Sequence, residues 1–241
     1  MKSATCRVMS ARRNAARRLQ VQRRHCSALA AAALAALLSA PSAKAAEGGR
    51  APLGDLLQIV VTPRALLAID GEGGGDTREP LERDEQVLWT GSRGLVGMVL
   101  TDRRVLAVRT RSGRWQTTRW RRGESQPAAA ELGDRVGLVA TDRRLLGFDG
   151  GSGNLAETSI GPSERVIQTR VAANVAVAVT TRRALGLSPF KGGFFEVSLR
   201  VGEALQQVEA SSEVVTITTS HRLLFFRART GAWSERRLEL R

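Results

Sequence analysis

The stretch VLTDRRVLAV (residues 99–108) decides the fold, because four variants of it recur along the same chain. The variants are VVTPRALLAI (60–69), VATDRRLLGF (139–148), AVTTRRALGL (178–187) and ITTSHRLLFF (217–226). The third residue of each stretch is a threonine, and successive threonines are 39, 40, 39 and 39 residues apart: Thr62, Thr101, Thr141, Thr180 and Thr219. A tandem period of this length indicates a repeat architecture with five units.

Two more positions keep a constant distance from each threonine. A glycine follows by twelve residues: Gly74, Gly113, Gly153, Gly192 and Gly231. A large apolar residue follows by fourteen in all units but the first, which has aspartate: Asp76, Trp115, Leu155, Phe194 and Trp233. Because glycine adopts positive φ at no steric cost, the glycines predict hairpin turns between strands.

Each unit reads as four strands. The run before the threonine, such as 96–100, is apolar on both faces, which is typical of a strand covered on both sides. A second strand follows the TDRR turn, a third begins near the position fourteen residues on, and a weaker fourth fills segments such as 86–90, 165–169 and 204–208. We expect the turn aspartate to bond to its own backbone. Small residues four before the threonine predict crowding near a central axis: Gly97, Gly137 and Ala176.

Four strands in about 40 residues, repeated in tandem, are typical of a β-propeller blade. The repeat rhythm resembles that of quinoprotein-like (PQQ-type) and WD-repeat propellers over about 62–241, and this resemblance implies architecture only. We therefore predict an all-β fold, a five-bladed β-propeller. Closure has three possible routes: a three-stranded first blade, pairing by segment 47–55, or a partner chain. An open blade edge also invites dimerisation.

The N-terminal region has the composition of an export signal. Residues 1–45 contain nine basic residues and no acidic one, and an apolar run covers 27–40. Ala43-Lys44-Ala45 fits a small-x-small cleavage site. We predict a signal peptide over 1–45 with cleavage near Ala45, a short N-terminal segment over 46–55 and the propeller over 56–241. A retained anchor is the alternative, although the run is shorter than a membrane span, and Met9 is an alternative start.

Removal of this leader changes the charge arithmetic. The whole chain has 37 basic and 23 acidic residues, so residues 46–241 keep 37 − 9 = 28 basic and 23 acidic residues, a net charge of +5. Cys6 and Cys26 leave with the leader, and His221 is the one histidine that remains. We expect no disulfide, metal or cofactor, no transmembrane span after cleavage, and a periplasmic or secreted protein. Export argues against a nucleic-acid partner.

The TDRR turns concentrate basic residues two and three positions after the repeat threonine. We predict a ligand- or partner-binding face from nine of them: Arg64, Arg103, Arg104, Arg143, Arg144, Arg182, Arg183, His221 and Arg222. Guanidinium groups bind carboxylate and phosphate through paired hydrogen bonds. In the alternative interpretation these are solvated turns whose arginine stems cover apolar edges.

Catalytic residues are not assembled by the sequence. There is no Ser-His-Asp set, and Asp102 and Asp142 stand beside arginines, which lower a carboxyl pKa and make a poor general acid. We expect a non-catalytic binding scaffold whose partner is an acidic protein or an anionic envelope polymer. The alternative is a carbohydrate-binding or glycosidase-like propeller, in which Trp115 and Trp233 stack on sugars rather than pack between blades.

Overall fold

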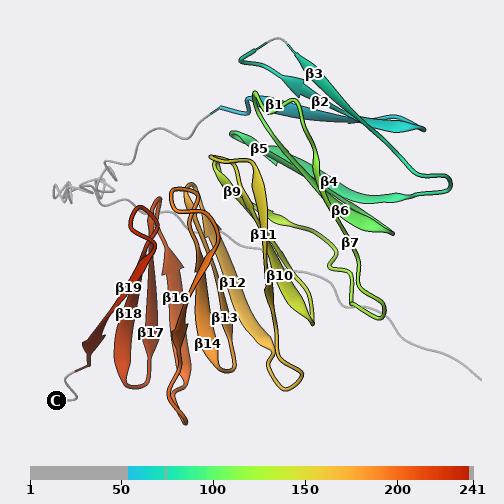
Figure 1. Cartoon of the computed structure of the whole chain (residues 1–241). Coiled ribbons are helices and arrows are strands. Elements are labelled where there is room, and N and C mark those ends of the chain that lie inside the picture. Colours follow the sequence, from blue (N-terminus) through green and yellow to red (C-terminus); the bar gives the residue numbers. More distant parts are fainter. Residues whose placement is uncertain (1–53, 74, 239–241) are drawn as a thin grey trace, which may run out of the picture. The chain divides into compact units, whose positions relative to one another are not determined.

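The computed structural model describes residues 54–73 and 75–238 (Figure 1). These residues form nineteen β-strands in five antiparallel sheets and contain no helix, in agreement with the predicted all-β fold. Accordingly, the described part has no helix long and apolar enough to cross a membrane. The predicted signal peptide, residues 1–45, lies outside the described residues.

Each sheet is built from strands that are consecutive in the chain. The first sheet has three strands: β1 (Leu57–Val61), β2 (Ala65–Asp70) and β3 (Asp76–Pro80). The second has four: β4 (Val87–Arg93), β5 (Val96–Thr101), β6 (Arg104–Arg109) and β7 (Gln116–Arg119). The third has β8 (Glu131–Leu132), β9 (Val136–Ala140), β10 (Arg144–Asp149) and β11 (Asn154–Ser159). The fourth has β12 (Val166–Ala172), β13 (Val175–Thr180), β14 (Arg183–Leu187) and β15 (Phe194–Ser198). The fifth has β16 (Leu205–Ala210), β17 (Val214–Thr219), β18 (Arg222–Arg227) and β19 (Ala232–Arg237).

The repeat glycines occupy the predicted hairpin turns. Four of them have φ between 57° and 80°, where side chains with a Cβ are strained: Gly113, Gly153, Gly192 and Gly231. Gly74 lies outside the described residues. The weak fourth strand of each unit opens the next sheet, so that β4, β12 and β16 each pair with the strand that follows. The first sheet, which has no such strand before it among the described residues, is three-stranded.

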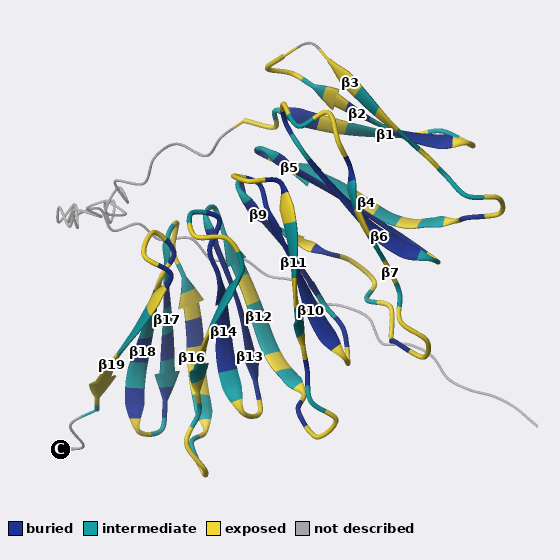
Figure 2. Cartoon of the chain, in the orientation of Figure 1, coloured by how far each residue is buried: buried dark blue, intermediate teal, exposed yellow. Residues whose placement is uncertain are grey.

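Apolar clusters join consecutive sheets. One cluster lies between the first and second sheets, one between the second and third, one between the third and fourth, and one between the fourth and fifth. The middle strands are covered on both faces, so all six residues of β5, β10 and β13 are buried (Figure 2). This burial explains why the runs before the threonines lack the alternation of a half-exposed strand.

The closed ring predicted from the repeats is not what the structure shows. A closed five-sheet ring needs a fifth apolar cluster between the last sheet and the first, and the described residues form four.

The crowding predicted at the small residues four before the threonine has a local cause. A Cβ on Gly97 would lie 2.6 Å from Leu57 Cδ2 of the first sheet, and one on Gly137 would lie 2.3 Å from Met98 Sδ of the second. The neighbouring sheet, rather than a central axis, therefore excludes a side chain.

Candidate functional site

The arginines of the TDRR turns separate into two groups, of which Arg144 represents the first. Its side chain is 3% exposed, and it donates from Nε to Glu124 Oε1 at 2.8 Å and from Nη2 to Glu124 Oε2 at 2.9 Å. Nη2 also donates to the Arg119 carbonyl at 2.6 Å, and Nη1 donates to Glu157 at 2.7 Å. Every nitrogen of this guanidinium is therefore used inside the protein.

The same arrangement recurs at the arginine three residues after each of the other three TDRR-type threonines. Its Nε lies 2.8–2.9 Å from a glutamate that precedes it by 19 residues: Arg104 with Glu85, Arg183 with Glu164, and Arg222 with Glu203. A second carboxylate contacts Nη1 in each case: Glu79 for Arg104, Glu196 for Arg183, and Glu235 for Arg222. We call these four arginines, with Glu85, Glu124, Glu164 and Glu203, the buried clamps.

Each clamp also holds the repeat threonine. Thr180 Oγ1 donates to Glu164 Oε1 at 2.7 Å, and it accepts from the backbone amides of Arg182 and Arg183 at 3.1 and 3.0 Å. Thr101, Thr141 and Thr219 make the equivalent bonds. Threonine recurs because a single hydroxyl closes the turn and completes the coordination of the buried carboxylate. Thr62 closes its own turn on Ala65, where the first unit has no arginine to clamp.

Geometry at the clamp keeps its glutamates ionised. Burial alone would raise the pKa of Glu164, but hydrogen bonds from Arg183, Thr180 and the Gly161 amide outweigh it and lower that pKa to about 2. For Glu203 the same opposition, with Arg222 as the strongest hydrogen-bond donor, also lowers the pKa to about 2. The pKa values of Glu85 and Glu124 are lowered for the same reasons.

The clamps join one sheet to the next. Each arginine donates from Nη2 to the carbonyl of the residue that ends the preceding sheet: Pro80 for Arg104, Arg119 for Arg144, Ser159 for Arg183, and Ser198 for Arg222. In a solvated turn these guanidiniums would be free to bind an external anion. Instead they bond the last strand of one sheet to the turn that opens the next, which is a structural role.

The second group of predicted site residues remains at the surface. Arg64, Arg143, Arg182 and His221 are exposed, and Arg103 is half-buried and paired with Glu82. Arg143 donates to the Arg122 carbonyl, Arg182 donates to Ser163 Oγ, and His221 Nδ1 lies 2.7 Å from Ser220 Oγ. Of the nine residues expected on one basic face, these five occupy turns and four belong to the buried clamps.

Connecting turns add further cations to the same end of the sheets. Arg83 lies in the turn before β4. Arg122 lies in the turn before β8, and its carbonyl accepts a hydrogen bond from Arg143. Arg165 directly precedes β12, and its backbone amide donates to Thr181 Oγ1. We call the surface formed by these three arginines and the five exposed or half-buried turn residues the turn rim: Arg64, Arg83, Arg103, Arg122, Arg143, Arg165, Arg182 and His221. Within the described residues, five exposed arginine side chains of the turn rim form no ion pair: Arg64, Arg83, Arg122, Arg165 and Arg182.

The turn carboxylates act as caps and not as a catalytic pair. Asp102 Oδ1 accepts the amide of Gln86 at 2.9 Å, and Asp142 Oδ1 accepts that of Ser125 at 2.8 Å. The expectation that each bonds its own turn is therefore wrong, because each carboxylate accepts an amide from the segment that leads into its sheet, 16 or 17 residues earlier. Thr181 and Ser220 accept the equivalent amides in the fourth and fifth sheets.

The repeat tryptophans pack between sheets, as the sequence indicates. Trp115 is 7% exposed, and its Nε1 donates to the Thr77 carbonyl of the first sheet. Trp233 Nε1 donates to the Phe195 carbonyl of the fourth sheet at 2.9 Å, and its ring stands 5.0 Å from that of Phe226. Trp115 is therefore buried, and Trp233 is half-buried against the fourth sheet.

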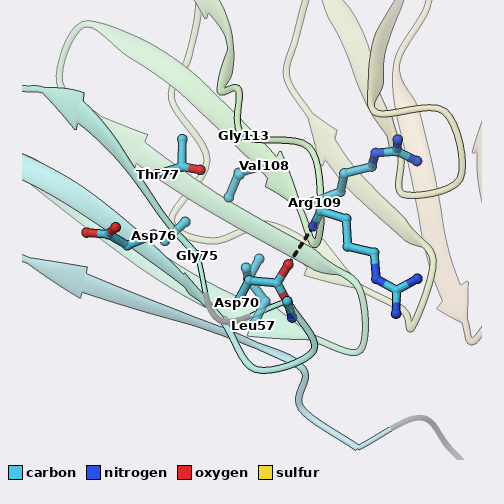
Figure 3. A pocket seen from close by; sticks show the side chains of 11 residues that line it. Leu57, Asp70, Gly75, Asp76, Thr77, Val108, Arg109 and Gly113 are labelled. Carbon is cyan, nitrogen blue, oxygen red and sulfur yellow. Dashed lines mark hydrogen bonds between the residues drawn. The ribbon is translucent and has the colours of Figure 1, made fainter.

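A cavity of about 340 Å³ lies between the outer hairpins of the first two sheets (Figure 3). Asp70 lines this cavity, and its carboxylate accepts the amide of Arg111 at 2.7 Å and those of Glu72 and Gly73. Burial opposes ionisation there, but these hydrogen bonds lower the pKa of Asp70. The carboxylate therefore serves the hairpin and is unsuited to donate a proton.

Comparisons with known proteins show similarity only at the level of structure. No family model matches the sequence, and no curated protein matches it. Among solved structures, HIRA(644-1017) shares 12% identity at a TM-score of 0.35, covering 76% of this chain and 56% of that chain. Prp20p from Saccharomyces cerevisiae, described with its binding to Gsp1p and histones, shares 10% at 0.38, covering 73% and 56%. The N-terminal domain of Nup159 shares 10% at 0.31, covering 78% and 62%.

These similar structures are β-propeller proteins. The chain spans between about half and two thirds of their lengths. One three-stranded sheet and four four-stranded sheets follow one another in chain order, and this arrangement alone is that of a propeller-type repeat.

The sequence interpretation missed the clamp glutamates. Glu85, Glu124, Glu164 and Glu203 recur at intervals of 39, 40 and 39 residues, the same period as the threonines. That period was the available signal. Their role stayed hidden because each glutamate meets its arginine across 19 or 20 residues, through a turn that leads from one sheet into the next.

Proposed function

We propose that this chain is an exported, non-catalytic binding scaffold whose turn rim binds an acidic protein or an anionic envelope polymer. One observation carries the proposal: the five arginines of the turn rim that have no carboxylate partner remain exposed, while the buried clamps neutralise the arginines beside them. Exposed guanidiniums in these turns form a positive surface, and its ligand supplies carboxylates or phosphates.

The clamps contribute to this function by fixing the position of the rim. Arg182 and Arg183 are neighbours, and the latter is held by Glu164 and by the Ser159 carbonyl. The turn that displays Arg182 is therefore attached to two sheets. Binding groups on a rigid support lose less conformational entropy when they meet a ligand.

The test uses the chain from Ala46 to Arg241, without the predicted leader and its nine basic residues, and a fluorescent poly-glutamate peptide as the probe. Arg64, Arg122, Arg165 and Arg182 are changed to Gln in one variant, and four exposed basic residues away from the turn rim are changed to Gln in the control: Arg114, Arg170, Lys191 and Arg227. We expect the unaltered chain and the control to bind in low salt and to lose the probe in high salt, because screening weakens exposed charge contacts. Loss of binding in the rim variant alone supports the proposal, and equal binding by both variants would overturn it.

Export has its own test. We expect the protein recovered from the envelope or medium of its host to begin near Ala46, as N-terminal sequencing shows. Recovery of a chain that starts at Met1 or Met9 would contradict the signal peptide.

A further inference from the structure

The interfaces between consecutive sheets follow one rule. Residues two before, five after and seven after the repeat threonine face the preceding sheet. In the second sheet these are Val99, Leu106 and Val108, which share a cluster with Leu66 and Ala68 of the first sheet. The equivalent residues of the later sheets belong to the clusters formed with their own preceding sheets: Val139, Leu146, Phe148, Ala178, Leu185, Leu187, Ile217, Leu224 and Phe226.

The first sheet presents the same three positions with no sheet before it among the described residues. They are Val60, Leu67 and Ile69, and we call them the leading face. None of them belongs to the four apolar clusters of the described residues, and Ile69 is 42% exposed. An apolar set that is buried in four repeats is therefore half-buried or exposed in this one.

The fifth sheet has the complementary half of the interface. Residues five before, four after and six after the threonine face the following sheet, as Val175, Ala184 and Gly186 do in the fourth. In the fifth sheet the corresponding residues are Val214, Leu223 and Phe225, which we call the trailing face. They are half-buried and belong to none of the four clusters.

The backbone gives the same pattern at the inner hairpins. Leu95 N donates to the Asp134 carbonyl, Arg135 N to Ala173, and Asn174 N to Ser212, so that each sheet bonds the next. At the two ends of the described sheets, the groups that would extend this series of bonds have no partner sheet: one is an amide donor and the other a carbonyl acceptor. These are the amide of Glu213 in the fifth sheet and the carbonyl of Asp55 before the first.

We propose that a second copy of this chain occupies these faces, so that the trailing face of one copy packs on the leading face of the other. The argument is continuity with the four internal interfaces, whose two halves stand uncovered at opposite ends of an open array. Each face therefore finds its complement on another copy. Such a contact is head-to-tail, and a pair of copies closes when both contacts form.

Residue sizes distinguish this contact from the internal ones. Gly147 lies against Leu187, and Gly186 lies against Phe226, so internally a small residue six after the threonine meets a large one seven after it. At the ends the corresponding pair is Phe225 with Ile69, two large side chains. Two large side chains need a wider spacing than the internal pairs have, and two separate copies can adopt that spacing more freely than sheets joined in one chain.

The experiment uses the full chain with Cys6→Ser and Cys26→Ser, which leaves no native thiol. One version carries Ile69→Cys and another, of different tag, carries Phe225→Cys. A short thiol-specific crosslinker is added to each version alone and to their mixture. We expect crosslinked dimers in the mixture and at most traces in either version alone, and no dimer when Ile167→Cys, similarly exposed but off the leading face, replaces Ile69→Cys.

Sedimentation velocity supplies the second measurement. We expect a dimer that dissociates on dilution and that Ile69→Asp abolishes, while circular dichroism of that variant is unchanged. Three results would overturn the proposal. They are crosslinking within single chains when both cysteines are in one copy, a cysteine at 69 that thiol reagents cannot reach in a monomer, and a monomer at all concentrations with no crosslink.

Discussion

Arg144 and Glu124 face each other through two parallel hydrogen bonds, Nε to Oε1 at 2.8 Å and Nη2 to Oε2 at 2.9 Å, with side chains 3% and 0% exposed. Removing one partner of such a pair leaves an uncompensated buried charge. Pairs of the same geometry recur at Arg104, Arg183 and Arg222, whose side chains are 6–22% exposed. Each of the four arginines also bonds a carbonyl of the preceding sheet, so the sheets are joined by polar contacts as well as by apolar clusters.

Glu124→Gln is expected to lower the free energy of unfolding by about 3 kcal/mol, because it leaves the Arg144 guanidinium buried beside a neutral amide. Urea unfolding at pH 7 measures the change. Asp84→Asn is the matched control, since Asp84 is exposed and the change is expected to stay within about 0.5 kcal/mol. Equal effects of the two substitutions would show that the clamp adds no stability.

Acid should weaken the fold through the same glutamates. The folded pKa values of Glu164 and Glu203 are lowered from 4.5 to about 2, so their contribution is complete above pH of about 4.5 and is lost as the pH falls toward 2. The full loss is on the order of 3 kcal/mol for each group. Urea unfolding at a series of pH values measures it, and a Glu164→Gln/Glu203→Gln variant should show a shallower fall. A parallel decline in the variant would assign the acid sensitivity to other groups.

Thr180→Val should destabilise the fold by about 2 kcal/mol, because it removes the hydroxyl that bonds Glu164 and two turn amides in a buried site. Thr62→Val is the comparison, since Thr62 is only half-buried and bonds its own turn without a glutamate. We expect the smaller loss there by thermal or urea unfolding. The reverse order would contradict the role given to the clamp carboxylate.

Gly186→Ala should cost about 1–3 kcal/mol, since its Cβ would lie 2.5 Å from the buried ring of Phe226 in the next sheet. Gly75→Ala meets no atom within 4 Å and should be nearly neutral. A neutral Gly186→Ala would mean that the fourth and fifth sheets pack less closely than the structure shows.

The strands, turns and packed tryptophans could be predicted because their signals are local. Gly231 takes the positive φ its position requires, and Trp233 packs on the preceding sheet as its period indicates. Whether the ring of sheets is closed could not be predicted, since an open array and a closed ring have the same sequence period. The division of the basic residues was also hidden: Arg143 stands in the turn, whereas Arg144 begins β10 and faces a buried glutamate.

The central claim is that adjacent arginines of one turn have separate roles, and the most direct test compares Arg144→Gln with Arg143→Gln. Both remove one positive charge, but the Arg143 side chain is 50% exposed. Urea unfolding should show a loss of about 3 kcal/mol for Arg144→Gln, which leaves Glu124 buried and unpaired, and a change within about 0.5 kcal/mol for Arg143→Gln. Equal losses, or a larger loss for Arg143→Gln, would contradict the division between buried clamps and turn rim.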